Sequence, residues 1–352
     1  MDQDTVAVYE ELARRYAELR PPRHRERAVA FAGLASPGRP LADLGCGPGI
    51  YFPHLGPAVV GLDAASAMLV EARAHVPGVP LVQADLEALP FRAGSLGGAW
   101  ARNTYVHLPR ERLPLALAHL HQALVVGAPV VLTALVGDDE GVLAGGDMPG
   151  RFFSHWPSER LAEVVAGAGL ALSSLEVVGD TTWITARRER TLPDFVGPGM
   201  RLLVCGLNPS LVAADAGFGY AGPTNRFWPA AVAAGLVTRP REPLAVLSVD
   251  GVGMTDLVKR ATPRADELSA DEYRAGADRV RRLVAWLQPA AVLFVGLAGW
   301  RAAVARRAEP GWQPDGFAGV PAYVMPSTSG LNAHARLADL AEHMRRAGSL
   351  PG

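Results

Sequence analysis

Apolar residues in this chain occur as short runs that alternate with longer amphipathic stretches, in two successive series. In the first series, runs of strand length occupy 40–45, 58–63, 80–85, 97–102 and 129–135. These runs contain few polar breaks, which is typical of parallel strands that helices cover on both faces. The segments 170–179 and 181–188 close the series, and we expect them to pair as an antiparallel edge hairpin.

The second series begins after a polar, proline-containing stretch at 186–200. Its expected strands are 201–209, 243–251, 290–297 and 321–329, and its expected helices are 224–236, 269–287 and 335–347. Alternating strands and helices predict an α/β fold class, here as two α/β/α domains. We assign residues 1–188 to the first domain, 189–200 to a linker and 201–352 to the second. A chain of 352 residues is long enough for each domain to bury its own core.

Composition gives only limited information about the cellular location and the binding partners of the protein. No apolar run reaches the roughly 18 residues that span a bilayer, and the first 20 residues indicate an amphipathic helix with early acids rather than a signal peptide. We therefore expect no membrane association. The two cysteines, Cys46 and Cys205, do not suggest a disulfide framework, so a cytoplasmic protein is expected. From Thr191 onward, 17 basic residues face 14 acidic ones, which permits DNA binding without proving it.

A glycine-rich motif, DLGCGPG at 43–49, stands at the end of the first expected strand and leads out of it. Glycines at alternate positions allow a sharp bend and close approach of a ligand to the backbone. Asp63 ends the second strand, where a carboxylate can hydrogen-bond both hydroxyls of a ribose. Asp85 ends the third strand, where an adenine edge would lie. A nicotinamide or other nucleotide domain stays open as an alternative, because glycine-rich loops are shared among these classes.

Together with the segment GSLGGAWARNTYVHLP at 94–109, these features resemble the class I S-adenosylmethionine-dependent methyltransferases over about residues 1–190. The resemblance implies a Rossmann-like, seven-stranded sheet and S-adenosylmethionine as the cofactor. It assigns the methionine part to Asp43, Gly45, Gly47 and Gly49, the ribose to Asp63, and the adenine to Asp85 and Leu86. A degenerate domain that no longer transfers methyl groups would carry the same pattern.

The methyl acceptor stays unknown at this stage. The Asn-Pro-Pro-Tyr loop of amino-directed DNA methyltransferases is absent, and RNTY at 102–105 stands in its place. Methyl transfer can depend mainly on orientation of the reactants, so no catalytic residue has to exist. We expect 137–156 to form a lid over the acceptor pocket. His107 is a candidate base there, and a half-buried structural histidine is the alternative.

Three motifs stand in order in the second half of the chain: GLNPS at 206–210, GYAGPTNRFW at 219–228 and MPSTSGLN at 325–332. With the stretch GVGMTDLVKRAT at 251–262, they resemble the mismatch-specific uracil/thymine-DNA glycosylases of the uracil-DNA glycosylase superfamily, over about 195–345. The resemblance implies a smaller, mainly parallel sheet. It also implies double-stranded DNA with a G·U or G·T mismatch as the partner.

The resemblance assigns roles to individual residues. Asn208 would hold the attacking water by its amide oxygen, and Tyr220 would stack on the extruded base. Leu331 would enter the helix as a wedge, with an ordinary core leucine as the alternative. A turn asparagine, common before proline, is the alternative for Asn208. The remaining expected DNA contacts are Gly206, Leu207, Pro209 and Ser210 around the base, and Ser327, Ser329, Gly330 and Asn332 on the phosphate-clamping loop.

Some positions depart from the family pattern. Ser210 replaces a glycine beside the pocket, and Asp256 stands where some relatives carry a lysine. Lys259 is the single lysine of the chain, so we expect a monofunctional hydrolase without a Schiff-base step. No cysteine or histidine cluster suggests a metal or an iron–sulfur centre. Two alternatives stay open: a non-catalytic DNA-binding module that delivers the methyltransferase, and an independent small-molecule methyltransferase fused by genomic accident.

Overall fold

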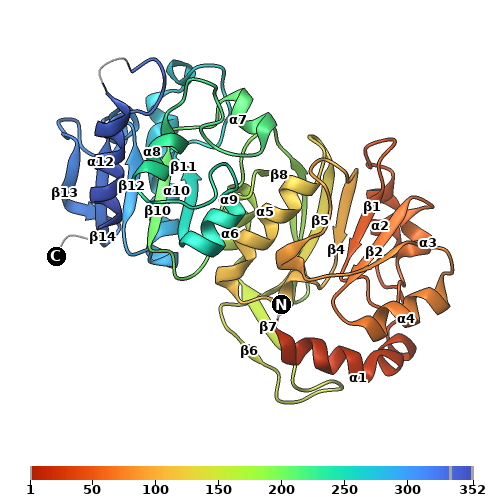
Figure 1. Cartoon of the computed structure of the whole chain (residues 1–352). Helices are drawn as coiled ribbons and strands as arrows, with labels where there is room; N and C mark the ends of the chain where they lie inside the picture. The colour runs from red at the N-terminus through yellow and green to blue at the C-terminus, as the bar shows by residue number, and fades with distance from the viewer. Residues whose placement is uncertain (1, 333–334, 350–352) are drawn as a thin grey trace. The chain divides into compact units, whose positions relative to one another are not determined.

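The computed structural model describes residues 2–332 and 335–349, and the chain divides into two compact units, Met1–Glu189 and Arg190–Gly352. Each unit contains one mainly parallel sheet with helices packed around it (Figure 1). The predicted α/β fold class with two sheets is therefore confirmed. Within the described ranges, no helix combines the length and the apolar character needed to cross a bilayer.

The sheet of the first unit has the strand order β3-β2-β1-β4-β5, and β5 continues through β9 to β8. Its strands are β1 (Leu41–Leu44), β2 (Val59–Asp63), β3 (Leu81–Gln83), β4 (Gly98–Ala101), β5 (Pro129–Val136), β6 (Glu140–Val142), β7 (Phe152–Trp156), β8 (Leu170–Val178) and β9 (Thr181–Arg188). The expected antiparallel pairing of the last two strands is present. However, β9 lies between β5 and β8, so of these two strands β8 alone lies at an edge of the sheet. The predicted seven strands form this path, and the β6–β7 hairpin raises the total to nine because it adds to the end of β5.

Helices and short 3₁₀ turns connect these strands. They are α1 (Gln3–Leu19), α2 (Arg25–Ala32), α3 (Phe52–Leu55), α4 (Ser66–His75), η1 (Leu86–Ala88), η2 (Tyr105–His107), η3 (Arg110–Arg112), α5 (Leu113–Ala123) and α6 (Ser158–Gly167). Asp2 caps the first helix by accepting a hydrogen bond from the Thr5 amide, 2.7 Å long. Glu10 accepts hydrogen bonds from the Ser66 and Ala67 amides, which fixes α1 against the positive N-terminal end of α4.

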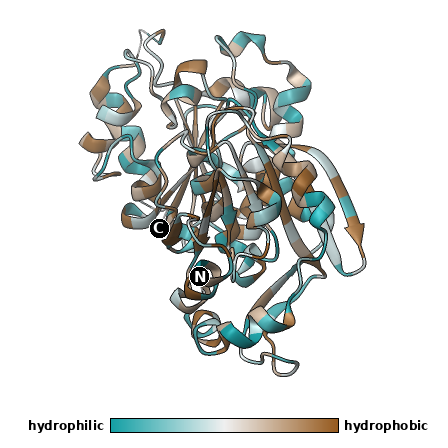
Figure 2. Cartoon of the chain, turned by 90° about the vertical axis from the view of Figure 1, so that its right-hand side faces the viewer, coloured by the Kyte–Doolittle hydropathy of each residue, from teal (hydrophilic) through white to brown (hydrophobic). Residues whose placement is uncertain are grey.

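The sheet of the second unit has the order β11-β10-β12-β14-β13, parallel except for the antiparallel pair β13–β14. Its strands are β10 (Leu202–Gly206), β11 (Val252–Asp256), β12 (Val292–Val295), β13 (Gly311–Phe317) and β14 (Val320–Met325). Its helices are α7 (Leu211–Ala216), α8 (Phe227–Ala233), α9 (Pro243–Asp250), η4 (Ala265–Glu267), α10 (Ala270–Leu287), α11 (Leu297–Ala303) and α12 (Leu337–Gly348). Strands are mainly apolar along the chain, whereas the helices carry polar residues on one side (Figure 2).

One predicted strand of this unit is wrong. The segment 243–251 forms the helix α9, and the strand follows it as β11, paired with β10 from Val252 to Asp256. Pro243 lies in the first turn, where its missing N–H costs nothing, and Gly251 ends the helix with a φ of 64°. A short apolar run does not distinguish a buried strand from a buried helix, which is why the pattern misled us.

The segment 190–200, which we expected to belong to the linker, packs into the second unit. Phe195 and Met254 exchange two backbone hydrogen bonds of 2.9 and 2.8 Å, so this extended segment pairs with β11. Asp194 is buried and forms ion pairs with Lys259 at 2.9 Å and Arg279 at 2.6 Å. The segment therefore contributes both backbone pairing and a charge to the core, while the domain limits given above stay a prediction.

Candidate functional sites

The glycine-rich loop follows β1, and its backbone conformation favours glycine. Gly45, Gly47 and Gly49 have φ values of 63°, 52° and 72°, in the left-handed region. A Cβ atom on Gly45 would lie 2.6 Å from the Thr104 side chain, and one on Gly49 would lie 2.5 Å from the Phe52 ring. The backbone angles favour glycine at all three positions, and at Gly45 and Gly49 the lack of space does so as well.

Two acidic side chains lie behind this loop. Asp63 accepts hydrogen bonds from the Gly47 amide at 2.8 Å and from the Ala65 amide at 3.0 Å. Burial raises the pKa of Asp63 to about 6, although these backbone N–H groups oppose the shift. Burial also raises the pKa of Asp43, helped by the negative charge of Asp63. The Oδ2 atom of Asp43 is buried without a hydrogen-bond partner, which fits a site completed by a polar ligand.

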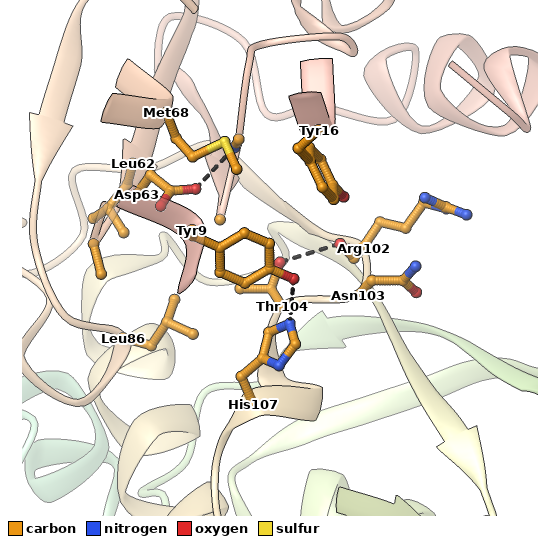
Figure 3. Close-up of a pocket in the computed structure, with 13 residues that line it drawn as sticks. Tyr9, Tyr16, Leu62, Asp63, Met68, Leu86, Arg102, Asn103, Thr104 and His107 are labelled. Atoms are coloured by element: carbon orange, nitrogen blue, oxygen red, sulfur yellow. Dashed lines mark hydrogen bonds between the residues drawn. The ribbon is translucent and has the colours of Figure 1, made fainter. Parts of the chain in front are cut away.

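A pocket of about 520 Å³ opens beside the loop (Figure 3). It brings together four of the residues expected to bind the cofactor: Gly45, Gly47, Asp63 and Leu86. The other three, Asp43, Gly49 and Asp85, are not part of its lining. Asp85 instead caps the turn η1 by accepting a hydrogen bond of 3.0 Å from the Glu87 amide.

Several residues that line this pocket were not among those that the sequence assigned to the cofactor. Tyr9 and Tyr16 come from α1, and Arg102, Asn103 and Thr104 follow β4. The tyrosines are seven residues apart, which places them on one face of the helix, so the amphipathic pattern contained a usable signal. Asn103 adopts a φ of 54°, an unusual conformation that occurs often at functional sites.

His107 lies at the edge of the pocket with both ring nitrogens hydrogen-bonded. Its Nδ1 atom is 2.7 Å from the carbonyl oxygen of Phe152, which can only accept, so Nδ1 carries the proton. Its Nε2 atom therefore accepts a hydrogen bond of 2.9 Å from the Tyr9 hydroxyl. Burial lowers the pKa of His107 to about 4. Burial thus keeps the histidine neutral and its two partners fix the ring, which favours the structural role over that of a base.

The second unit places Asn208 on the loop after β10, with its side-chain nitrogen facing three acceptors. The amide nitrogen lies 3.2 Å from the Pro209 carbonyl oxygen, 3.0 Å from that of Arg260 and 2.8 Å from the Thr262 hydroxyl. Carbonyl oxygens only accept, so the nitrogen, not the oxygen, must face them. The amide oxygen therefore points the opposite way and accepts no hydrogen bond from the described residues. The amide nitrogen thus ties this loop to the segment from Arg260 to Thr262, a contact that a simple turn asparagine would also make.

Tyr220 and Asp256 lie close to the start of this loop. Tyr220 stacks on Phe227 with ring centres 3.9 Å apart, and its hydroxyl is buried without a partner. Burial raises the pKa of Tyr220, with the nearby Asp256 adding to the effect. Burial also raises the pKa of Asp256 to about 6. A Cβ atom on Gly206 would clash with the Asp256 carboxylate and lie 3.0 Å from the Tyr220 hydroxyl, so a side chain here would displace both groups.

These side chains surround a pocket of about 650 Å³. Seven of the expected residues line it: Leu207, Asn208, Pro209, Ser210, Tyr220, Ser329 and Gly330. Gly206, Ser327, Leu331 and Asn332 are not in its lining. The Ser210 hydroxyl caps α7 by accepting a hydrogen bond of 3.1 Å from the Ala213 amide. Asp256, Thr224 and Asn225 also line the pocket and were not assigned to it from the sequence.

The loop from Ser327 to Asn332 is fixed by Arg226. One guanidinium nitrogen donates to the carbonyl oxygens of Ser329 at 3.0 Å and of Asn332 at 2.7 Å. The Asn332 side chain adds a hydrogen bond of 2.9 Å to the Ser327 carbonyl oxygen. At the tip of this loop, Leu331 is 97% exposed. The alternative of a core leucine is thereby excluded, and the geometry agrees with a projecting wedge.

Lys259 is not part of the lining of this pocket. Its ammonium group is bound to Asp194, and only 13% of its side chain is exposed. Among the described residues, no group of three or more histidine, cysteine or acidic side chains is arranged to hold a metal ion.

Comparisons with known proteins agree with this division. Residues 41–127 match the family model of a methyltransferase domain, and residues 193–347 match that of the uracil DNA glycosylase superfamily. Similar solved structures include DhpI in complex with SAH (18% identity, 53% of this chain and 96% of that chain covered, TM-score 0.43). The CcbJ methyltransferase from Streptomyces caelestis shares 20% identity over 54% of this chain and all of that chain, with a TM-score of 0.44. A methyltransferase from Mesorhizobium loti shares 19% identity over 45% and 96%, with a TM-score of 0.37.

Both family matches fall within the two structural units and cover the motifs described above. The chain carries a methyltransferase domain followed by a domain of the uracil DNA glycosylase superfamily.

Proposed function

We propose that the second domain is a monofunctional DNA glycosylase that hydrolyses the N-glycosidic bond of uracil, and of thymine or damaged pyrimidines, mispaired with guanine. The observation that carries this proposal is the orientation of Asn208. Its amide nitrogen is bound to acceptors of the protein, so its oxygen is left to hold a water beside the pocket. A positioned water suffices, because a transition state with oxocarbenium character needs no strong base.

The surroundings of Asn208 fit an extruded base. Tyr220 offers an aromatic surface, and the backbone from Leu207 to Ser210, which lines the pocket, can stabilise negative charge that develops on the leaving base. The exposed Leu331 would fill the space that the base leaves in the duplex, on a loop that Arg226 fixes in advance. A binding module without hydrolysis would need the wedge but not the oriented amide.

The first domain uses S-adenosylmethionine as a methyl donor for an acceptor that its motifs do not name. The cofactor supplies an activated methyl group on a sulfonium. The chain's own residues fit it through the glycines of the loop, the Asp63 carboxylate and the apolar Leu86 in one pocket. We place the protein in the cytoplasm, because Cys46 and Cys205 are both buried free thiols.

Cleavage of labelled duplexes tests the glycosylase. Duplexes that contain one G·U, G·T or A·U pair are incubated with the full chain, with Asn208→Ala and with the surface variant Ser248→Ala as a matched control. We expect alkali-sensitive breaks at G·U, reduced roughly 100-fold or more by Asn208→Ala with DNA binding retained, and unchanged by Ser248→Ala.

Other results would contradict parts of the proposal. DNA binding without breaks in any duplex would make the second domain a reader of damage that delivers the methyltransferase. Breaks that form without alkali would indicate a lyase step and would contradict a monofunctional enzyme.

A further inference from the structure

A second cavity adjoins the pocket that contains Asp63 in the first unit. It has a volume of about 900 Å³ and shares five residues with that pocket: Tyr9, Tyr16, Arg102, Asn103 and His107. In the view of Figure 3, the tyrosine rings stand between the Asp63 carboxylate and the Arg102 guanidinium group. A molecule in the second cavity would therefore lie next to a ligand in the first.

The second cavity is lined by four arginines and by no acidic residue: Arg20, Arg23, Arg102 and Arg151. Arg151 is only 6% exposed, and it donates hydrogen bonds of 2.9 Å to the Met148 carbonyl oxygen and 3.1 Å to the Tyr9 hydroxyl. Among the residues that the structure describes, Asp147 is the one carboxylate paired with this group; it binds Arg20 and lies 3.7 Å from Arg151. Four cations thus share a single counter-ion.

Tyr51 is the side-chain partner of Arg102, through a hydrogen bond and a ring contact. The Nε atom of Arg102 is buried without a hydrogen-bond partner, and its guanidinium group lies 5.8 Å from the centre of the Tyr51 ring. Neither Arg102 nor Arg23 forms an ion pair with a carboxylate among the described residues. A partly buried cation without a counter-ion is unfavourable, so an anionic ligand would relieve the cost. Arginine also matches the geometry of carboxylate and phosphate groups.

The shape of the site indicates how large the ligand is. Val106, Leu135 and Phe153 complete the wall, so the arginines converge in a hollow with apolar sides. A nucleic acid would instead be followed by a strip of positive charge along an open surface. The hollow suits a small molecule with one anionic end and an apolar or aromatic body.

We propose that the methyl acceptor of the first domain is a small molecule that carries an oxyanion, a carboxylate or a phosphate-type group, bound by Arg102 and Arg23. This rests on the proposed function of that domain as a methyltransferase. Arg151 acts as a positioning residue, because its hydrogen bond to Tyr9 extends through the Tyr9 hydroxyl to His107 and fixes the wall shared by the two cavities.

Calorimetry on the full chain tests this proposal. The protein is first titrated with S-adenosylhomocysteine and then, in its presence at low salt, with benzoate, its neutral analogue benzamide, and inorganic phosphate. The variants are Arg102→Gln, Arg23→Gln and, as a matched control on α1, Arg14→Gln, whose side chain is 85% exposed and outside both cavities. Thermal unfolding checks that each variant is folded, and the exposed Arg23 gives a second test if Arg102→Gln is not.

We expect at least one of the two anions to bind, and benzamide to bind at least roughly 10-fold more weakly. Arg102→Gln and Arg23→Gln should each weaken anion binding by about 10-fold, with Arg14→Gln unchanged. Preference for phosphate or for benzoate identifies the kind of oxyanion. Equal binding of benzamide, no binding of either anion, or wild-type affinity in both variants would overturn the proposal. Failure to bind S-adenosylhomocysteine would instead overturn the methyltransferase function.

Discussion

Replacing the exposed Leu331 by alanine should lower cleavage of duplex DNA without changing the stability of the protein. Leu331 is 97% exposed, so its truncation removes almost no packing and should change the free energy of unfolding by less than about 0.5 kcal/mol. In the complex the same side chain would be buried between bases. Burying a leucine contributes about 1.5–3 kcal/mol, most of which alanine loses, so cleavage of a G·U duplex should fall roughly 10- to 60-fold.

The assay is single-turnover cleavage of the G·U duplex and of the same uracil strand without its complement. A single strand has no stack to fill, so Leu331→Ala should cleave it at nearly the wild-type rate. Val249→Ala is the matched control, because Val249 lies on α9 of the same unit and is 62% exposed. An equal loss on the duplex and on the single strand, or no loss on the duplex, would refute the wedge.

Three further predictions follow from buried groups of the second unit. Burial raises the pKa of Asp256 to about 6. The protonated side chain therefore contributes fully to the stability of the folded state below about pH 4, and this contribution is lost as the pH rises through 6. Asp256→Asn should therefore raise the free energy of unfolding by up to about 3 kcal/mol at pH 8 and leave it unchanged at pH 4. Thermal unfolding at the two pH values measures this difference, and an equal effect at both would contradict the prediction. Asp194→Ala leaves Lys259 and Arg279 without their counter-ion and should lower the free energy of unfolding by about 3–5 kcal/mol in denaturant titrations; a neutral result would mean that 190–200 is not part of the core. Gly206→Ala should reduce uracil cleavage strongly while the circular dichroism spectrum stays native, because the added methyl group would displace the Asp256 carboxylate and the Tyr220 hydroxyl from the pocket wall. Wild-type cleavage would show that the positions of these two groups do not matter.

Local sequence determined much of the fold and of both sites. The loop at 43–49 and the motif at 206–210 lie at strand ends because glycine, proline and an adjoining apolar run restrict the backbone there. The strand assigned to 243–251 failed because an apolar run of that length fits either element until its partners are known. Only the pairing of β10 with β11 decides between them.

The parts that sequence could not supply depend on contacts between distant residues. Tyr9 reaches His107 across 98 positions, and Arg226 reaches the Asn332 carbonyl oxygen across 106. No local pattern records such pairs. The arginines of the second cavity are equally inconspicuous, because arginine is frequent in this chain and only folding brings four of them together without acids.

The three acceptors around the Asn208 nitrogen also limit how this protein can change over generations. An aspartate at this position would direct a negative oxygen at the carbonyl groups of Pro209 and Arg260, which repel it. Asn208→Asp is the exchange that should strengthen water activation. It is thus unfavourable as a single substitution and requires an earlier change in the segment from Arg260 to Thr262. Asn208→Asp alone should therefore cleave G·U DNA more slowly than the wild type, and a faster variant would show that this path is open.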